Sequence, residues 1–77
     1  MPTISLNGES RTLPTDCSVE DLIRTLESEA RESGTRGLDR RALAVEVNRA
    51  IVPRSTYAEH PLAEGDEIEI VTIVGGG

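Results

Sequence analysis

The 77-residue sequence contains no lysine, phenylalanine or tryptophan, and it has a single cysteine and a single tyrosine. A core without Phe or Trp must be built from Leu, Ile, Val and Ala, and it offers no array of aromatic platforms for stacking nucleobases. The lone Cys17 excludes an intramolecular disulfide. Because all 8 basic residues are arginine, no side chain of this chain can accept an isopeptide bond.

Long apolar runs and an excess of positive charge are also missing. No apolar stretch approaches the roughly 20 residues of a membrane-spanning helix, and no charged start followed by an apolar run predicts a signal peptide. The formal charge of −6, from 14 acidic and 8 basic residues, disfavours nucleic acid or an anionic membrane as a partner and favours a basic protein. We therefore expect one small cytoplasmic domain without a deep enclosed active site.

The first elements present are a hairpin and a helix. Residues 3–15 alternate polar and apolar positions around Asn7-Gly8, the dipeptide most favoured in tight hairpin turns. Ser18 stands three residues before Asp21, in the spacing of a capping box, and begins a helix predicted over residues 18–32. Apolar residues at helical spacing define one face of this helix: Val19, Leu22, Ile23, Leu26 and Ala30.

The second half of the chain predicts the rest of the sheet. Residues 42–47 are nearly continuously apolar, as expected of a central strand. A short strand at residues 51–52 and one irregular helical turn over residues 55–60 follow. The residues after Asn48 include no glycine, which argues against a tight turn of the primed type there.

The last predicted strand, residues 67–74, begins as a strict alternation of glutamate, facing water, and isoleucine, facing the core. With this register kept, Thr72 and Val74 point inward, whereas Val71 and Ile73 fall on the glutamate face. Two apolar β-branched residues on that face indicate either a surface covered by another protein or ordinary strand propensity with a bulge.

Three glycines, Gly75, Gly76 and Gly77, follow this strand. They supply no side chain to pack, so we expect a flexible tail of residues 75–77 on a folded domain of residues 1–74. If this chain takes part in chemistry, we expect the reacting group to be the terminal carboxylate of Gly77 rather than a group in a pocket.

Other candidate groups have simpler structural interpretations. Cys17 precedes the helix cap and is expected to pack in the core, although a helix N-terminus can lower the pKa of a thiol. His60 has no second histidine or cysteine at metal-ligand spacing, so no metal site is expected. Ser18 is explained as a cap, which argues against a triad with Asp21 and His60. The arginines of the polar loop at residues 34–41 are interpreted as solvated side chains: Arg36, Arg40 and Arg41.

The predicted element order is strand, strand, helix, strand, short strand, strand. This order indicates an α+β fold with a mixed sheet of about four to five strands and one main helix packed across one face. It is the β-grasp arrangement of ubiquitin-like proteins.

Four groups of residues carry a resemblance to a known family. They are Val45-Glu46-Val47-Asn48, Ile51-Val52-Pro53-Arg54, Leu62-Ala63-Glu64-Gly65-Asp66 with Ile68-Glu69-Ile70, and the terminal Gly76-Gly77. With them, the chain resembles the sulfur carrier proteins of thiamine biosynthesis, the ThiS family, in the broader group that includes the small subunit of molybdopterin synthase. Tyr57 departs from the pattern, since many relatives have Trp there.

The resemblance implies a protein substrate rather than an enzyme. An E1-like adenylyltransferase of the ThiF type would use ATP to adenylate the carboxylate of Gly77. Sulfur from a cysteine desulfurase would turn the adenylate into a thiocarboxylate, and a thiazole synthase of the ThiG type would take the sulfur. The carrier itself would bind no cofactor. The tail would thread into the partner through Gly75, Gly76 and Gly77, and the docking face would comprise Val71, Ile73 and Val74.

Three alternatives remain open from the sequence alone. One is the small subunit of molybdopterin synthase, whose tail inserts permanently into a larger enzyme. Another is a ubiquitin-like modifier joined through Gly77 to lysines of other proteins. The third is a β-grasp binding module with an incidental tail.

Overall fold

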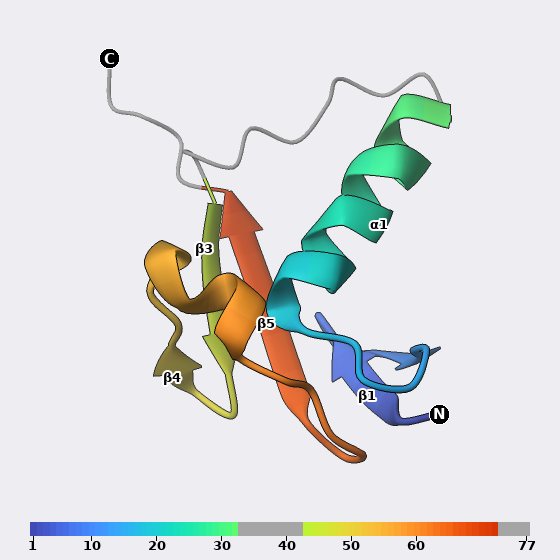
Figure 1. Cartoon of the computed structure of the whole chain (residues 1–77), viewed down its shortest axis with the longest axis vertical. Helices are drawn as coiled ribbons and strands as arrows, with labels where there is room; N and C mark the ends of the chain where they lie inside the picture. Colours follow the sequence, from blue (N-terminus) through green and yellow to red (C-terminus); the bar gives the residue numbers. More distant parts are fainter. Residues whose placement is uncertain (33–42, 73–77) are drawn as a thin grey trace.

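The structure is a computed structural model that describes residues 1–32 and 43–72. Its elements are β1 (Thr3–Leu6), β2 (Glu9–Thr12), α1 (Val19–Glu32), β3 (Leu43–Val47), β4 (Ala50–Ile51), the 3-10 helix η2 (Arg54–Glu59) and β5 (Glu67–Thr72). The strands form one sheet in the order β2-β1-β5-β3-β4, and α1 crosses one face of it (Figure 1). The predicted mixed sheet with one main helix is confirmed.

Strand β5 lies at the centre of this sheet and makes it mixed. It runs parallel to β1, with Ser5 opposite Glu67, and antiparallel to β3, with Val45 opposite Ile70. The last described strand of the chain therefore joins the N-terminal hairpin to the β3-β4 hairpin. The predicted strand extends to residue 74, and its final two residues lie outside the described part of the chain.

Helix α1 begins with the capping box that the sequence predicts. The backbone N–H of Asp21 donates to Ser18 Oγ at 3.1 Å, and the backbone N–H of Ser18 donates to Asp21 Oδ2 at 3.1 Å. Each residue thus satisfies a donor that the first turn of a helix leaves without an intrahelical partner. This exchange fixes the start of α1 within one residue of the predicted position.

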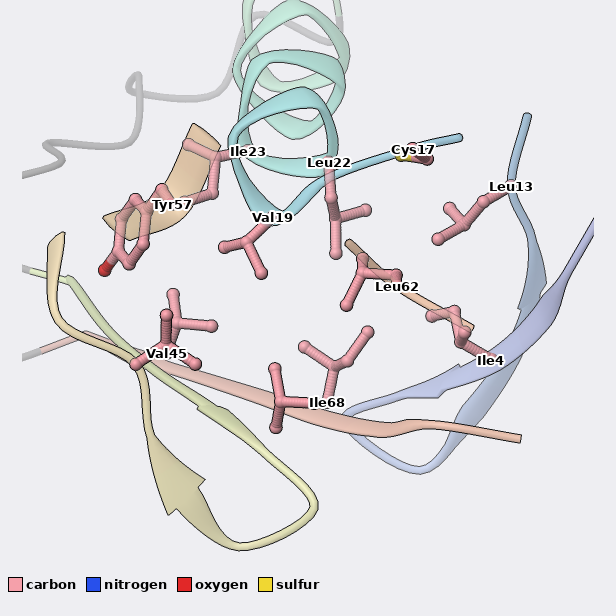
Figure 2. Close-up of a cluster of buried hydrophobic side chains, with 12 residues drawn as sticks. Ile4, Leu13, Cys17, Val19, Leu22, Ile23, Val45, Tyr57, Leu62 and Ile68 are labelled. Atoms are coloured by element: carbon pink, nitrogen blue, oxygen red, sulfur yellow. The ribbon is translucent and has the colours of Figure 1, made fainter. Parts of the chain in front are cut away.

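The core lies between α1 and the sheet. Val19, Leu22 and Ile23 have no exposed surface. Figure 2 shows Val19 and Leu22 pointing toward side chains of the sheet, among them Val45 and Ile68. Burying each of these aliphatic side chains stabilises the fold by about 1.5–3 kcal/mol. The helical face predicted from the sequence is therefore the face that packs against the sheet.

The two hairpin turns have the same backbone form. Asn7 and Gly8 have φ angles of 51° and 86°, as predicted for a tight primed turn. Asn48 and Arg49 also have positive φ, 53° and 71°, between the paired residues Val47 and Ala50.

The expectation that the second turn is not of the primed type is therefore wrong. Hydrogen bonds from distant residues hold it without a glycine. Asn48 Nδ2 donates to Asp66 Oδ1 at 3.1 Å, and the backbone N–H of Glu67 donates to Asn48 Oδ1 at 3.0 Å. Asparagine tolerates the left-handed conformation better than most residues, and these bonds offset the strain at Arg49.

The short elements also differ slightly from the prediction. The second strand, Glu9–Thr12, lies within the hairpin predicted over residues 3–15, and β4 is Ala50–Ile51 rather than residues 51–52. The irregular helical turn is confirmed as η2. In the described part of the chain, no helix has the length and apolar character needed to span a membrane.

Candidate functional site

The candidate site is the sheet face opposite α1, which we call the open face. Along β5, Glu67, Glu69 and Val71 are exposed, whereas Ile68 is buried and Ile70 packs partly against the core. The predicted alternation is confirmed up to Val71, whose exposed fraction is 49%. An apolar side chain therefore stands on the glutamate face at the end of the described strand.

The neighbours of Val71 on the open face follow from the strand register. Ala44 of β3 lies opposite Val71, and Glu46 lies opposite both Glu69 of β5 and Ile51 of β4. Residues directly opposite one another in a ladder carry their side chains on the same face. Ile51, with an exposed fraction of 72%, is thus a second exposed apolar residue of the open face, and the sequence analysis missed it.

The charge of the open face is mainly negative. Glu46, Glu67 and Glu69 line a shallow pocket of about 150 Å³ together with Arg49. Glu46 and Glu69 are direct cross-strand partners, an arrangement that destabilises a sheet when both carry the same charge. This face is suited to contact a basic protein surface, the class of partner that the net charge favours.

The tail that the sequence singles out continues from β5. Ile73, Val74, Gly75, Gly76 and Gly77 all lie outside the described residues, so their predicted roles stay predictions. The structure does describe the strand that precedes them. Its backbone is held on one edge by β3 and on the other by β1. The described chain is therefore paired with β1 up to Ile68 and with β3 up to Thr72.

Cys17 has a structural environment rather than a reactive one. Its exposed fraction is 4%, and burial raises the pKa of its thiol, with a smaller contribution from the negative charge of Asp21. This direction is opposite to the lowering that an exposed helix N-terminus can cause. Cys17 is part of the core cluster, as its structural interpretation predicts.

Ser18, Asp21 and His60 have separate roles in the structure. Ser18 and Asp21 bond to each other at the cap of α1, and the backbone carbonyl of His60 accepts the N–H of Val19 at 2.9 Å. Within residues 1–32 and 43–72, no group of three His, Cys, Asp or Glu side chains is arranged to hold a metal ion. The predicted loop arginines Arg36, Arg40 and Arg41 lie outside the described residues.

Comparison with known proteins assigns the chain to a family. A model of the ThiS family matches residues 4–77. Thiazole synthases of Paramagnetospirillum magneticum and Magnetococcus marinus are 40% identical over 72 residues and 36% identical over 74 residues, respectively. These alignments cover 94% and 96% of this chain but 19% and 20% of the two relatives. The chain thus spans about a fifth of their length.

A solved structure shows the same fold. The crystal structure of a thiamine biosynthesis protein (ThiS) from Geobacter metallireducens superposes with a TM-score of 0.75 at 21% identity, covering 97% of this chain and 99% of that one. The β-grasp prediction is therefore confirmed. Because the family model matches nearly the whole chain, from the first strand to the terminal glycine, the protein belongs to the ThiS family.

Proposed function

We propose that this protein is the sulfur carrier for thiazole formation in thiamine biosynthesis, and that the carboxyl group of Gly77 carries the sulfur. The observation that carries the proposal is the ThiS-family match, which extends to Gly77 itself. The described geometry is consistent with it, because β5, the last described strand before the glycines in the sequence, is the central strand of the sheet.

The chemistry needs an activated carboxyl group. A carboxylate is a poor electrophile until one of its oxygens becomes a good leaving group. Attack of the Gly77 carboxylate on the α-phosphorus of ATP forms an acyl-adenylate and releases pyrophosphate. A persulfide sulfur on a partner enzyme then attacks the acyl carbon and displaces AMP, which leaves an acyl disulfide. A second thiol attacks the partner-side sulfur of that disulfide, so that a new disulfide forms and the thiocarboxylate leaves. In this proposal the activating enzyme binds the ATP, and the desulfurase provides the sulfur. The partner enzymes therefore supply the catalytic groups, and this chain supplies the carboxyl group that reacts.

The tail composition suits such partners. Glycine has no Cβ, so Gly75, Gly76 and Gly77 can pass through a narrow channel in extended or positive-φ conformations. Val71 is exposed where β5 approaches the tail, and we propose that it docks on the partner together with Ile73 and Val74. In this proposal the folded body binds the partner, and the glycines carry the carboxyl group of Gly77 to the partner's active site.

We propose three partners. An E1-like adenylyltransferase of the ThiF type activates Gly77, a cysteine desulfurase provides sulfur, and a thiazole synthase of the ThiG type accepts it. Two thiazole synthases contain a segment that is similar to this chain and makes up about a fifth of their length. This similarity supports a thiazole synthase as the acceptor of the sulfur. Because activation consumes ATP, we place the carrier in the cytoplasm.

Intact mass spectrometry tests the proposal. The purified chain is incubated with the ThiF-type enzyme, ATP, cysteine and the desulfurase, and the expected product has one oxygen replaced by sulfur. Deleting Gly77, or adding a tag after it, should abolish this product, while the same tag before Met1 should not. Far-UV circular dichroism verifies that each variant is folded. A thiocarboxylate on the chain with the blocked tail would refute the proposal.

The same preparations separate the alternatives. Stable copurification with the large subunit of molybdopterin synthase would indicate its small subunit instead. Conjugates joined through Gly77 to lysines of other proteins would indicate a modifier. Unchanged partner affinity after removal of residues 75–77 would indicate a binding module with an incidental tail.

A further inference from the structure

The side chain of Asn7 extends the pairing between β1 and β5 beyond the point where β1 turns away. The parallel ladder pairs Leu6 with Ile68, and the backbone N–H of Asn7 donates to the carbonyl of Ile68 at 2.9 Å. The next two hydrogen bonds to β5 come from the side-chain amide of Asn7. The N–H of Ile70 donates to Asn7 Oδ1 at 2.9 Å, and Asn7 Nδ2 donates to the carbonyl of Ile70 at 3.3 Å. The amide therefore bonds both backbone groups of Ile70, as a neighbouring strand would.

The turn itself does not require this amide. Asn7 has a φ of 51° in a two-residue turn completed by Gly8, and glycine satisfies such a position as well as asparagine does. The two bonds to Ile70 link residues that are 63 positions apart in the sequence. Their effect is consequently on β5 and not on the hairpin.

The bonds from Asn7 set the length of β5 that is held on both edges. The opposite edge of the strand pairs with β3, where Ile70 lies opposite Val45 and Val71 lies opposite Ala44. Without the Asn7 amide, the edge facing β1 would have its last partner at Ile68. With it, that edge is held up to Ile70, the residue directly before the exposed Val71.

We propose that Asn7 is a positioning residue for the carrier reaction, an inference that rests on the proposed function. By anchoring Ile70, it holds the edge of β5 that faces β1 directly before Val71, whose opposite edge pairs with Ala44. A partner that binds at Val71 then meets a strand whose backbone is already held. Ordering a flexible backbone costs entropy. A partner therefore binds more tightly to a strand end that is already anchored than to one that must first become ordered.

The test variant is Asn7→Gly, and Asn48→Gly is its matched control. Both replacements keep a residue that adopts positive φ, and both remove an amide that bonds to β5. Asn48, however, acts at the start of the strand, on Glu67 and Asp66. Asn7→Asp keeps the acceptor for the Ile70 N–H and loses the donor, so it should lie between the wild type and Asn7→Gly.

Two measurements are made on each variant. In the free chain, amide exchange at Ile70 should become about fivefold faster in Asn7→Gly, the change expected from one net hydrogen bond, and Asn48→Gly should affect Glu67 instead. In thiocarboxylate formation with the ThiF-type enzyme, the KM for Asn7→Gly should rise about fivefold with kcat unchanged. Asn48→Gly, although less stable, should keep the wild-type KM.

An unchanged KM in Asn7→Gly, or an equal rise in Asn48→Gly, would overturn the positioning role. Unchanged exchange at Ile70 would show that Asn7 does not anchor the strand and would overturn it as well. A wild-type chain that forms no thiocarboxylate would refute the proposed function itself. A normal wild-type reaction combined with an unaffected Asn7→Gly variant would refute only the role of Asn7.

Discussion

Replacing Val71 by threonine tests whether the end of β5, rather than the open face as a whole, docks on the proposed activating enzyme. Threonine keeps the β-branched shape and the strand propensity of valine but exchanges one methyl group for a hydroxyl. The exposed fraction of Val71 is 49%, and burying a whole valine side chain is worth about 1.5–3 kcal/mol. The half that remains exposed can therefore contribute about 0.7–1.5 kcal/mol when a partner covers it.

Most of this contribution should be lost in Val71→Thr, because the new hydroxyl must also be desolvated. We expect the KM for the carrier in pyrophosphate release to rise about three- to tenfold. The value of kcat should not change, since the lost interaction is made equally in the ground state and the transition state. Thermal unfolding should shift little, because the side chain is half exposed in the free protein.

Ile51→Thr is the control for this experiment. Ile51 is more exposed than Val71 and lies on the same face, but it belongs to β4 and not to the strand that leads to the tail. Its KM should stay within about twofold of the wild type, a change smaller than one methyl group contributes. An unaffected KM in Val71→Thr, or the same rise in both variants, would contradict docking through the end of β5.

Four further predictions concern the stability of the fold. Ser18→Ala should lower the free energy of unfolding by about 1 kcal/mol in urea titrations, because the N-cap acceptor is lost. The hydrogen bond from the backbone N–H of Ser18 is the main cause that lowers the pKa of Asp21 below 3.8. The contribution of ionised Asp21 to the free energy of unfolding is therefore complete above about pH 4 and is lost as the pH falls through the lowered pKa. Asp21→Asn should remove this part of the pH dependence of stability, and an unchanged dependence on acid pH would contradict the assignment. Glu69→Gln should raise stability at pH 7 by about 0.2–1 kcal/mol, since it relieves the like-charge pair with Glu46, and a fall in the melting temperature would argue against that repulsion. Arg49→Gly should stabilise the protein by up to about 1 kcal/mol in the same titrations, because glycine adopts positive φ without a Cβ clash, and a loss of stability would show that the arginine side chain contributes more than the strain costs.

The elements with strong periodicity could be predicted from the sequence. Helix α1 has an apolar stripe and a capping box, both local in sequence, and its predicted and observed bounds differ by one residue. The alternation in β5 predicted which side chains face the core and placed Val71 on the opposite face. In these segments the local pattern and the tertiary packing favour the same structure.

The features that were missed depend on pairing between distant segments. The turn at Asn48 and Arg49 is held by Asp66 and Glu67, which the local sequence does not reveal. The exposure of Ile51 follows from its place on an edge strand. The bonds from the Asn7 side chain could be found only once the register between the first and last strands was known. In the sequence, Asn7 predicts the turn, but it does not indicate that its side chain also bonds to Ile70.

The central position of β5 also has a consequence for how this chain comes to exist in a cell. In the sheet order, the β1-β2 hairpin and the β3-β4 hairpin are joined only through β5, and an isolated two-stranded hairpin is at best marginally stable in water. A growing chain therefore cannot complete the sheet until residues 67–72 have left the ribosome. A protease that cuts within β5 separates the tail from the chain and also breaks the strand that joins the two hairpins, so we expect the domain to unfold. Such a cut is therefore not expected to leave a folded fragment that lacks only the glycine tail.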